Sequence, residues 1–163
     1  QKNSKIILDA KSGISGAGKS SVENGLEKDI KENFKSYNVD FHRHQPEIKD
    51  FLKIEFDLDH EIIFIPHLLP LFRGEYVTLY CEVTQNDLNL NELYESFYEK
   101  DKLVRIKEKG EIAELKDVIN TIYCDISVSY AFQSNIIVVN SAIDNLLKGA
   151  ASQAIQCLDI MSS

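Results

Sequence analysis

The chain has 163 residues, of which 44% are hydrophobic and 27% are charged, a balance typical of one soluble globular domain and not of a disordered or collagen-like protein. Its 18 Lys and Arg residues are outnumbered by 26 Asp and Glu residues, which gives a formal net charge of −8. This negative charge argues against nucleic acid or an anionic membrane as the main partner. We expect a single domain over residues 1–163.

Membrane and cysteine patterns bear on where the protein works. The longest apolar runs, such as Ile136 to Val139, are far shorter than the roughly 18 residues that span a bilayer, and no signal peptide pattern opens the chain. Three cysteines without paired spacing fit a reducing compartment better than a disulfide scaffold. We therefore expect a cytoplasmic protein. Because the first residue is Gln1 and not Met, we also expect a piece of a longer protein.

The first third of the chain predicts a strand, a loop and two helices. Lys5 to Ala10 is typical of a short strand, and a Gly/Ser-rich loop follows from Ser12 to Ser20. Apolar residues four apart indicate a helix over 22–34. We then expect an extended segment from Tyr37 to His44 and a short helix with Pro46 in its first turn.

The middle of the chain predicts two strands, a loop and a helix. Glu61 to Ile65 is a compact apolar strand, and two prolines and a glycine make Pro66 to Gly74 an expected irregular crossing loop. Polar and apolar residues alternate over 77–83 with the period of a half-buried strand. Apolar spacing over 90–97 indicates a helix.

The last third predicts a hairpin and a closing helix. Residues 122–130 alternate like a strand, and 135–140 enclose four β-branched residues like a strand buried on both faces, with the turn at Phe132 to Ser134. Residues 143–158 form an expected amphipathic C-terminal helix. Because strands outnumber helices without strict alternation, we predict an α+β fold with a mixed, largely antiparallel sheet and helices packed on one face.

One short motif admits several interpretations. Gly13, Gly18, Lys19 and Ser20 have the spacing of a phosphate-binding loop of nucleotide-binding phosphotransferases. Such a loop starts directly from a buried strand, whereas a polar gap from Asp9 to Ser12 interrupts the apolar run. Neither Glu61 to Ile65 nor Ile136 to Val139 ends in a carboxylate for magnesium. The alternatives are a flexible turn or a loop whose small residues closely approach another anionic substrate.

Five segments in order resemble one enzyme family. They are Asp9 to Lys19, His42-Arg43-His44-Gln45-Pro46-Glu47-Ile48, Pro66 to Gly74, Tyr123 to Ile126 and Asp144 to Ala154. Together they resemble the N-acetyl-γ-glutamyl-phosphate reductase family, which is related to aspartate-semialdehyde dehydrogenase. The resemblance extends over nearly the whole chain and implies an NADPH-dependent step of arginine biosynthesis that converts the acyl phosphate to the semialdehyde.

The resemblance also shows what the chain lacks. Family members carry a dinucleotide-binding domain and a nucleophilic cysteine in an Asn-x-Gly-Cys element, and the neighbours of Cys81, Cys124 and Cys157 do not match it. The chain therefore resembles the substrate-binding and dimerisation domain alone, and we expect it to be inactive in isolation and to form a homodimer or homotetramer. The alternatives are a nucleotide-binding phosphotransferase and a non-catalytic oligomerisation module.

The resemblance implies that His42 and His44 carry the acid–base chemistry. The reaction requires a group that keeps the thiol ionised and a proton donor for the oxyanion, and imidazole serves both purposes near neutral pH. On an extended segment both rings would share one face while Arg43 points to the other. The sequence leaves open which ring is the acid–base. His60 and His67 add no paired spacing, so we expect no metal site.

Other residues are implied as ligand contacts. Arg43 and Arg73 are candidates to clamp the carboxylate or phosphate of the substrate, because a guanidinium group binds such oxyanions through two hydrogen bonds. The expected substrate-binding residues are Ser12, Gly13, Ser15, Gly16, Arg43, Glu47 and Arg73. The expected NADP-binding residues are Asn145, Lys148 and Gly149, with Asn145 reaching the nicotinamide carboxamide.

Overall fold

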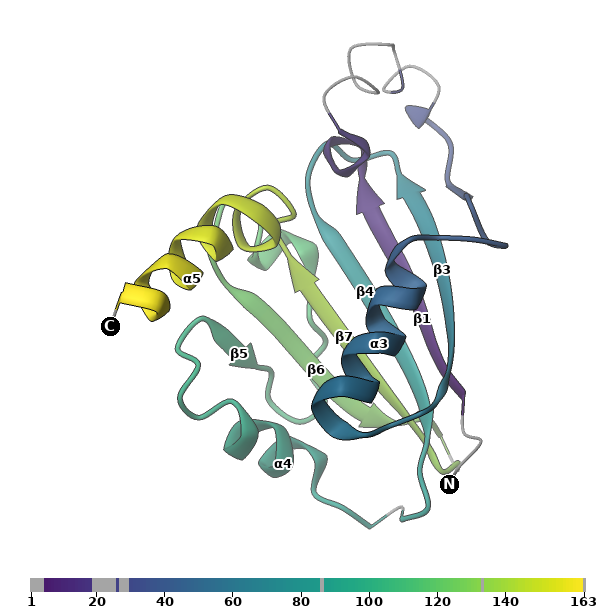
Figure 1. Cartoon of the computed structure of the whole chain (residues 1–163), viewed down its shortest axis with the longest axis vertical. Helices are drawn as coiled ribbons and strands as arrows, with labels where there is room; N and C mark the ends of the chain where they lie inside the picture. The colour runs from purple at the N-terminus through teal and green to yellow at the C-terminus, as the bar shows by residue number, and fades with distance from the viewer. Residues whose placement is uncertain (1–4, 19–25, 27–29, 86, 133, 163) are drawn as a thin grey trace.

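The computed structural model describes residues 5–18, 26, 30–85, 87–132 and 134–162, and its centre is a seven-stranded sheet (Figure 1). The strands are β1 (Lys5–Gly13), β2 (Lys35–Ser36), β3 (Glu61–Leu69), β4 (Glu75–Glu82), β5 (Val104–Ile106), β6 (Cys124–Tyr130) and β7 (Ile136–Ile143). Their order across the sheet is β2-β3-β1-β4-β7-β6-β5. β1 runs parallel to β3 and β5 to β6, whereas the other neighbours are antiparallel. The predicted α+β class with a largely antiparallel sheet is confirmed.

The described residues also form short turns and three α-helices with given bounds. They are the 3-10 turns η1 (Ile14–Ala17) and η2 (Leu115–Asp117), the α-helices α3 (His44–Phe56), α4 (Leu90–Phe97) and α5 (Ser152–Ser162), and the π-helical turn η3 (Leu147–Ala151). Most of the helix predicted over 22–34 lies outside the described residues. No helix in the described part of the chain is both long and apolar enough to cross a membrane.

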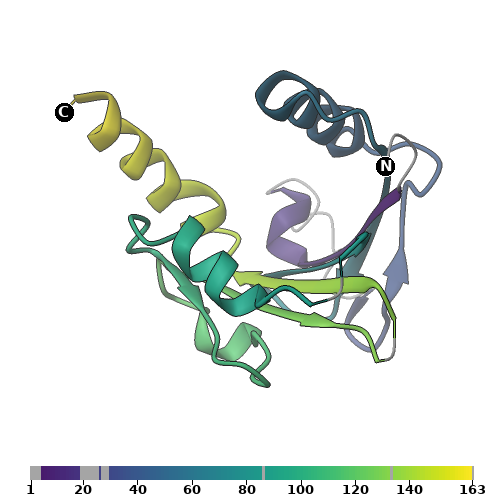
Figure 2. The same cartoon turned by 90° about the horizontal axis from the view of Figure 1, so that it is seen from below.

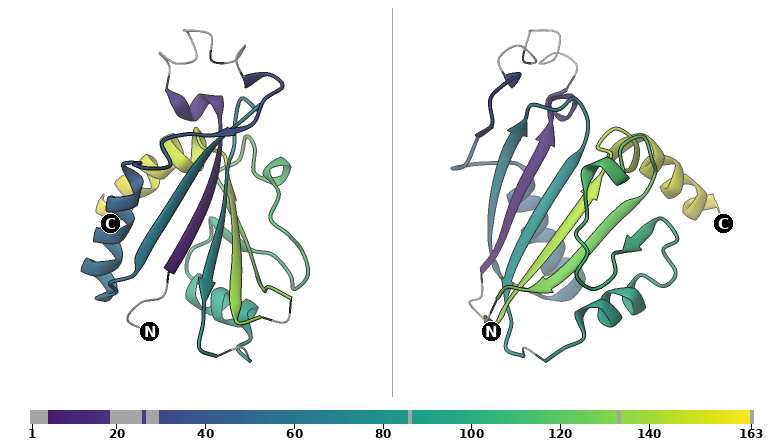
Figure 3. Two further views of the ribbon diagram at one scale, coloured as in Figure 1. Left: turned by 90° about the vertical axis from the view of Figure 1, so that its right-hand side faces the viewer. Right: turned by 180° about the vertical axis from the view of Figure 1, so that it is seen from behind.

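One face of the sheet carries the core. Strand register places Phe64, Leu8, Leu79, Val139 and Val128 in one row across five strands. Helix α3 packs on one end of this row and α4 on the other, and the two core clusters share a residue of β4. Figures 2 and 3 show α3 and α5 on this side of the sheet and η2 on the opposite side. The sheet therefore has a face with the α-helices, called the helical face below, and an opposite face.

The strand predictions were wrong at two boundaries. β1 continues to Gly13, so the polar residues from Asp9 to Ser12 do not interrupt it as the sequence had indicated. β3 likewise runs through Pro66 to Leu69, where we predicted an irregular loop. The carbonyl of Pro66 accepts a hydrogen bond from the N–H of Tyr37, so the backbone of Pro66 faces away from β1, and its missing N–H leaves the pairing with β1 intact.

The C-terminal predictions were partly right. The hairpin of β6 and β7 is confirmed, but Ile136 is exposed and β7 is not buried on both faces. The closing helix begins at Leu147 and not at 143, because β7 extends to Ile143 and the carboxylate of Asp144 accepts hydrogen bonds from the first N–H groups of the helix. The apolar side chains of α5, such as Leu158, are exposed.

Candidate active site

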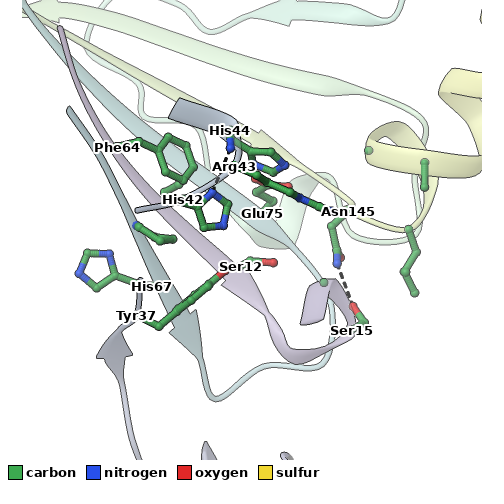
Figure 4. A pocket seen from close by; sticks show the side chains of 16 residues that line it. Ser12, Ser15, Tyr37, His42, Arg43, His44, Phe64, His67, Glu75 and Asn145 are labelled. Carbon is green, nitrogen blue, oxygen red and sulfur yellow. Dashed lines mark hydrogen bonds between the residues drawn. The ribbon is translucent and has the colours of Figure 1, made fainter. Parts of the chain in front are cut away.

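A cavity of about 380 Å³ opens on the helical face, at the end of the sheet where β1 and β3 finish and β4 begins (Figure 4). Its floor is formed by side chains of β1, β3 and β4, one wall by residues 37–44, and the opposite wall by η1 and the start of the last helix. This arrangement brings together segments from both ends of the chain. The cavity contains most of the residues that the sequence implied.

Backbone hydrogen bonds hold the loop after β1 against the turn before β4. The N–H groups of Gly13, Ile14 and Ser15 donate to the carbonyls of Gly74, Leu71 and Phe72 at 2.8, 2.9 and 3.0 Å. A side chain on Gly16 would place its Cβ 2.3 Å from the hydroxyl of Ser12, so glycine there lets the loop lie close to the strand. The turn therefore presents Ser12, Ser15 and Gly16 to the cavity.

Asn145 fixes this loop against the turn before β4. Its Oδ1 accepts a hydrogen bond of 2.8 Å from the N–H of Gly74, and its Nδ2 donates one of 2.9 Å to the hydroxyl of Ser15 (Figure 4). Asn145 is 8% exposed, so these bonds are shielded from water. The amide thus joins three segments that are distant in sequence, and it positions the Ser15 hydroxyl at the cavity wall.

The two candidate imidazoles meet in this cavity. The ring centroids of His42 and His44 are 4.7 Å apart, and the ring of Phe64 stacks on His42 at 4.9 Å. We had predicted that the two rings share one face because residues 37–44 are extended. That reason was wrong, because the chain is not extended at residues 43 and 44. His44 is the first residue of α3 and Arg43 has helical φ and ψ angles, so the turn into the helix brings the rings together.

The contacts of the two rings differ. The backbone N–H of His44 donates to Nδ1 of His42 at 3.3 Å, so the proton of a neutral His42 ring lies on Nε2. Burial lowers the pKa of His42, the charges of His44 and Arg43 lower it further, and Glu47 opposes them. His42 is therefore suited to donate a hydrogen bond from Nε2 while it stays neutral at pH 7. No hydrogen bond within the described chain occupies the ring nitrogens of His44.

The cavity also contains polar residues that sequence reasoning missed. Tyr37 lies on the wall beside His42, at 5.9 Å between ring centroids, and Glu75 lies at the floor. Burial raises the pKa of Tyr37, and the charge of Glu75 adds to this effect. Burial raises the pKa of Glu75 as well, although the charge of His44 acts in the opposite direction. The only sign in the sequence that Tyr37 and Glu75 belong to the site is that they lie close along the chain to the segments His42 to Ile48 and Pro66 to Gly74.

Four of the implied ligand contacts lie outside the cavity lining. Glu47 is exposed on the first turn of α3, and Gly13 is buried and contributes backbone hydrogen bonds. The guanidinium of Arg73 donates to buried Asp144 at 3.2 Å, and the ammonium of Lys148 donates to Gln156 at 2.6 Å. By contrast, Arg43, Asn145 and Gly149 line the cavity.

No cysteine lines this cavity in the described chain. Cys81, Cys124 and Cys157 are free thiols located on β4, β6 and α5. Burial raises the pKa of the first two, which opposes formation of a thiolate. The two imidazoles therefore face no thiol of this chain.

A sequence comparison identifies the family. The family model described as semialdehyde dehydrogenase, dimerisation domain, matches residues 1–145. The chain belongs to the semialdehyde dehydrogenase dimerisation-domain family. N-acetyl-gamma-glutamyl-phosphate reductases of Thermoanaerobacter sp. (strain X514) and Geobacillus sp. (strain WCH70) are 39% and 42% identical to it over 160 and 159 residues. These matches confirm the resemblance predicted from the five segments.

The matched region is only part of those relatives. Each alignment covers 96% of this chain but 46% of the relative, so the chain spans less than half their length, and the matched part is C-terminal. None of the relatives and structures named here is a nucleotide-binding phosphotransferase.

Solved structures of the semialdehyde dehydrogenase family have the same fold. Aspartate semialdehyde dehydrogenase II of Vibrio cholerae aligns with a TM-score of 0.74 at 15% identity and covers 97% of this chain and 54% of that protein. The enzyme of Francisella tularensis aligns with a TM-score of 0.70 at 14% identity and covers 97% and 57%. The sheet and its helices are thus the arrangement common to this family.

Proposed function

We propose that this chain is the substrate-binding and dimerisation domain of an NADP-dependent reductase that converts N-acetyl-γ-glutamyl phosphate to the semialdehyde in arginine biosynthesis. The observation that carries the proposal is the meeting of His42 and His44 in one cavity that contains no thiol of the described chain. Acyl-phosphate reduction through a thioester needs a cysteine nucleophile and imidazole groups beside it. Here the nucleophile belongs to another part of the polypeptide, and the protein acts in the cytoplasm.

The two imidazoles take different roles in this proposal. His42 is held by the N–H of His44 and keeps its Nε2 proton, so it donates a hydrogen bond to a substrate oxygen. No hydrogen bond within the described chain occupies the ring nitrogens of His44. His44 therefore accepts the proton of the thiol and donates a proton to the oxyanion. Arg43, on the same wall, pairs with the substrate carboxylate or phosphate.

NADP contacts in this domain are limited to the edge of the cavity. Asn145 uses Oδ1 and one Nδ2 hydrogen within the protein, which leaves one N–H and one lone pair for a nicotinamide carboxamide. Gly149 lines the cavity without a side chain, whereas Lys148 is bonded to Gln156. Bound NADPH would supply the hydride. The fit is to the nicotinamide end alone, so the rest of the cofactor requires another domain.

A second copy of the chain is the proposed partner. Strand register places Ile63, Ile7, Tyr80 and Val138 side by side on the opposite face of the sheet, and each is only half-buried. An apolar row of this kind is typical of sheet-to-sheet contact between subunits. We therefore propose that this face forms a homodimer contact, which is also the contact on which a tetramer would be built.

Nuclear magnetic resonance of the 163-residue chain tests the proposal. Titration with N-acetyl-L-glutamate and inorganic phosphate together is expected to shift the ring nitrogen signals of His42 and His44 and to leave His60 in place, because the first two line the cavity. The rotational correlation time in the same spectra is expected to be that of a dimer. Shifts confined to residues outside the cavity, or no shifts, would contradict the assigned substrate site.

A further inference from the structure

Glu75 has no role in the proposal so far, yet it lines the floor of the cavity. It is the first residue of β4 and pairs in register with Ser12 of β1, so the two side chains lie next to each other on the helical face. Gly74, with φ of +112°, turns the chain into the strand immediately before it. Figure 4 shows the side chain of Glu75 in this cavity, and the charge of His44 acts on it.

The carboxylate of Glu75 is the unpartnered acid of this site. It is half-buried, and no hydrogen bond or ion pair joins it to any described residue. Buried acids elsewhere in the described chain are bonded: Asp125 accepts from Arg105 at 2.5 Å, and Asp144 accepts from Arg73 at 3.2 Å. The side chain of Glu75 lines the cavity without a donor from the described chain, so its carboxylate is available to a donor on a bound ligand.

The chemistry of a carboxylate limits what that donor can be. An ionised carboxylate only accepts hydrogen bonds, and it repels the phosphate and carboxylate groups of an acyl phosphate. The proposed substrate has a single N–H group, on its acetamido nitrogen, and no other donor. The positive Arg43 lies on the wall formed by residues 37–44, where it can hold the anionic end of the same molecule.

We propose that Glu75 is a specificity-determining residue that accepts a hydrogen bond from the N–H group of the substrate's acylated amine. This inference rests on the proposed function and adds to it the group of the substrate that the site selects, which is the N–H of the acylated amine. The cavity then recognises three points of one molecule: the N–H at Glu75, the oxyanion at Arg43 and the reacting carbonyl at the imidazoles. Three separate contacts fix the orientation of the substrate and favour one configuration at its α-carbon.

Dissociation constants of two ligands test the assignment on the 163-residue chain. The ligands are N-acetyl-L-glutamate and N-acetyl-N-methyl-L-glutamate, which differ in the N–H, and the signals of the cavity residues report binding. A hydrogen bond to a charged acceptor is expected to make the first ligand bind about 10- to 100-fold more tightly to the wild-type chain. In Glu75→Met this ratio is expected to approach 1, while Glu75→Gln, which keeps an amide oxygen, gives an intermediate ratio.

A matched control lies on the same strand. Glu82 is exposed at the other end of β4 and accepts from Asn135 at 3.0 Å, so Glu82→Met is expected to leave the ratio at its wild-type value. A ratio that stays high in Glu75→Met would show that the methyl group is excluded by shape alone and would overturn the inference. Absence of binding of both ligands to the wild-type chain would instead contradict the proposed function itself.

Discussion

Replacement of His44 by glutamine is expected to lower kcat by about 10²- to 10⁴-fold in a chimera that joins this chain to the N-terminal half of the Thermoanaerobacter relative. That half contains the region which this chain does not match. The physical reason is that the amide of glutamine can form hydrogen bonds but cannot exchange a proton near neutral pH. The limb of the pH profile of kcat/KM that depends on the acid–base group is expected to disappear together with the activity.

His42 variants give the contrasting result. Asparagine places an acceptor where Nδ1 receives the N–H of His44, whereas glutamine places a donor where Nε2 carries its proton. His42→Gln is therefore expected to raise KM less than His42→Asn, and both are expected to retain the pH limb of kcat/KM. Steady-state kinetics over a pH series measures both effects.

The opposite pattern would reverse the assigned roles. If His42→Gln removed the pH limb and His44→Gln retained it, His42 would be the acid–base and His44 the orienting group. The lowered pKa of His42 argues for the first assignment, because it keeps this ring neutral through the physiological range.

Replacement of Asp144 by alanine is expected to lower the free energy of unfolding by about 3 kcal/mol at pH 7. Its carboxylate accepts from the guanidinium of Arg73 at 3.2 Å and from the N–H groups of Asn120, Leu146 and Leu147 at 2.8, 2.9 and 3.1 Å. The side chain of Asp144 is fully buried, whereas that of Arg73 is 33% exposed and can be hydrated after the change. This partial exposure places the loss at the lower end of the range for broken buried ion pairs.

The loss in the free energy of unfolding depends on pH, because the carboxylate of Asp144 stabilises the fold only when it is ionised. Burial by itself would raise the pKa of Asp144, but hydrogen bonds from Asn120, Leu146, Arg73 and Leu147 outweigh it and hold the pKa below its ordinary value. The stabilisation is therefore fully present above about pH 4, the ordinary aspartate range, and is lost as the pH falls through the lower pKa of the folded state. The difference between wild type and Asp144→Ala should shrink in acid.

Urea denaturation at neutral and acid pH measures this difference. The matched control is Asp57→Asn, which removes one charge of an exposed ion pair with Lys53 and is expected to leave the stability unchanged. A loss that is equal at pH 7 and pH 3, or no loss at all, would contradict the capping role of Asp144.

The sequence predicted the parts of the site that lie close together along the chain. Alternation marked β4 and β6, and the small residues from Ser12 to Gly16 marked the loop. Each of these depends on residues within a few positions of one another. Local periodicity and turn chemistry are therefore sufficient to predict them.

Long-range pairing explains most of what the sequence did not reveal. Arg73 is bound by Asp144, which is 71 residues away, and Glu75 reaches the cavity through its register with Ser12. Pro66 was expected to end a strand, but its backbone faces away from β1 toward the side of β2, which only the order of strands reveals. Such assignments follow from tertiary contacts, on which a local pattern carries no information.

Oxidation of NADPH by the chimera tests the central claim most directly, namely that the cavity of this chain acts on a thiol from another part of the polypeptide. Turnover is expected only when N-acetyl-γ-glutamyl phosphate and the joined half with its cysteine are both present, and it is expected to be abolished when His42 and His44 are replaced together. The chain alone is expected to show none. Turnover by the chain alone, or turnover by the chimera that survives the loss of both rings, would contradict the claim.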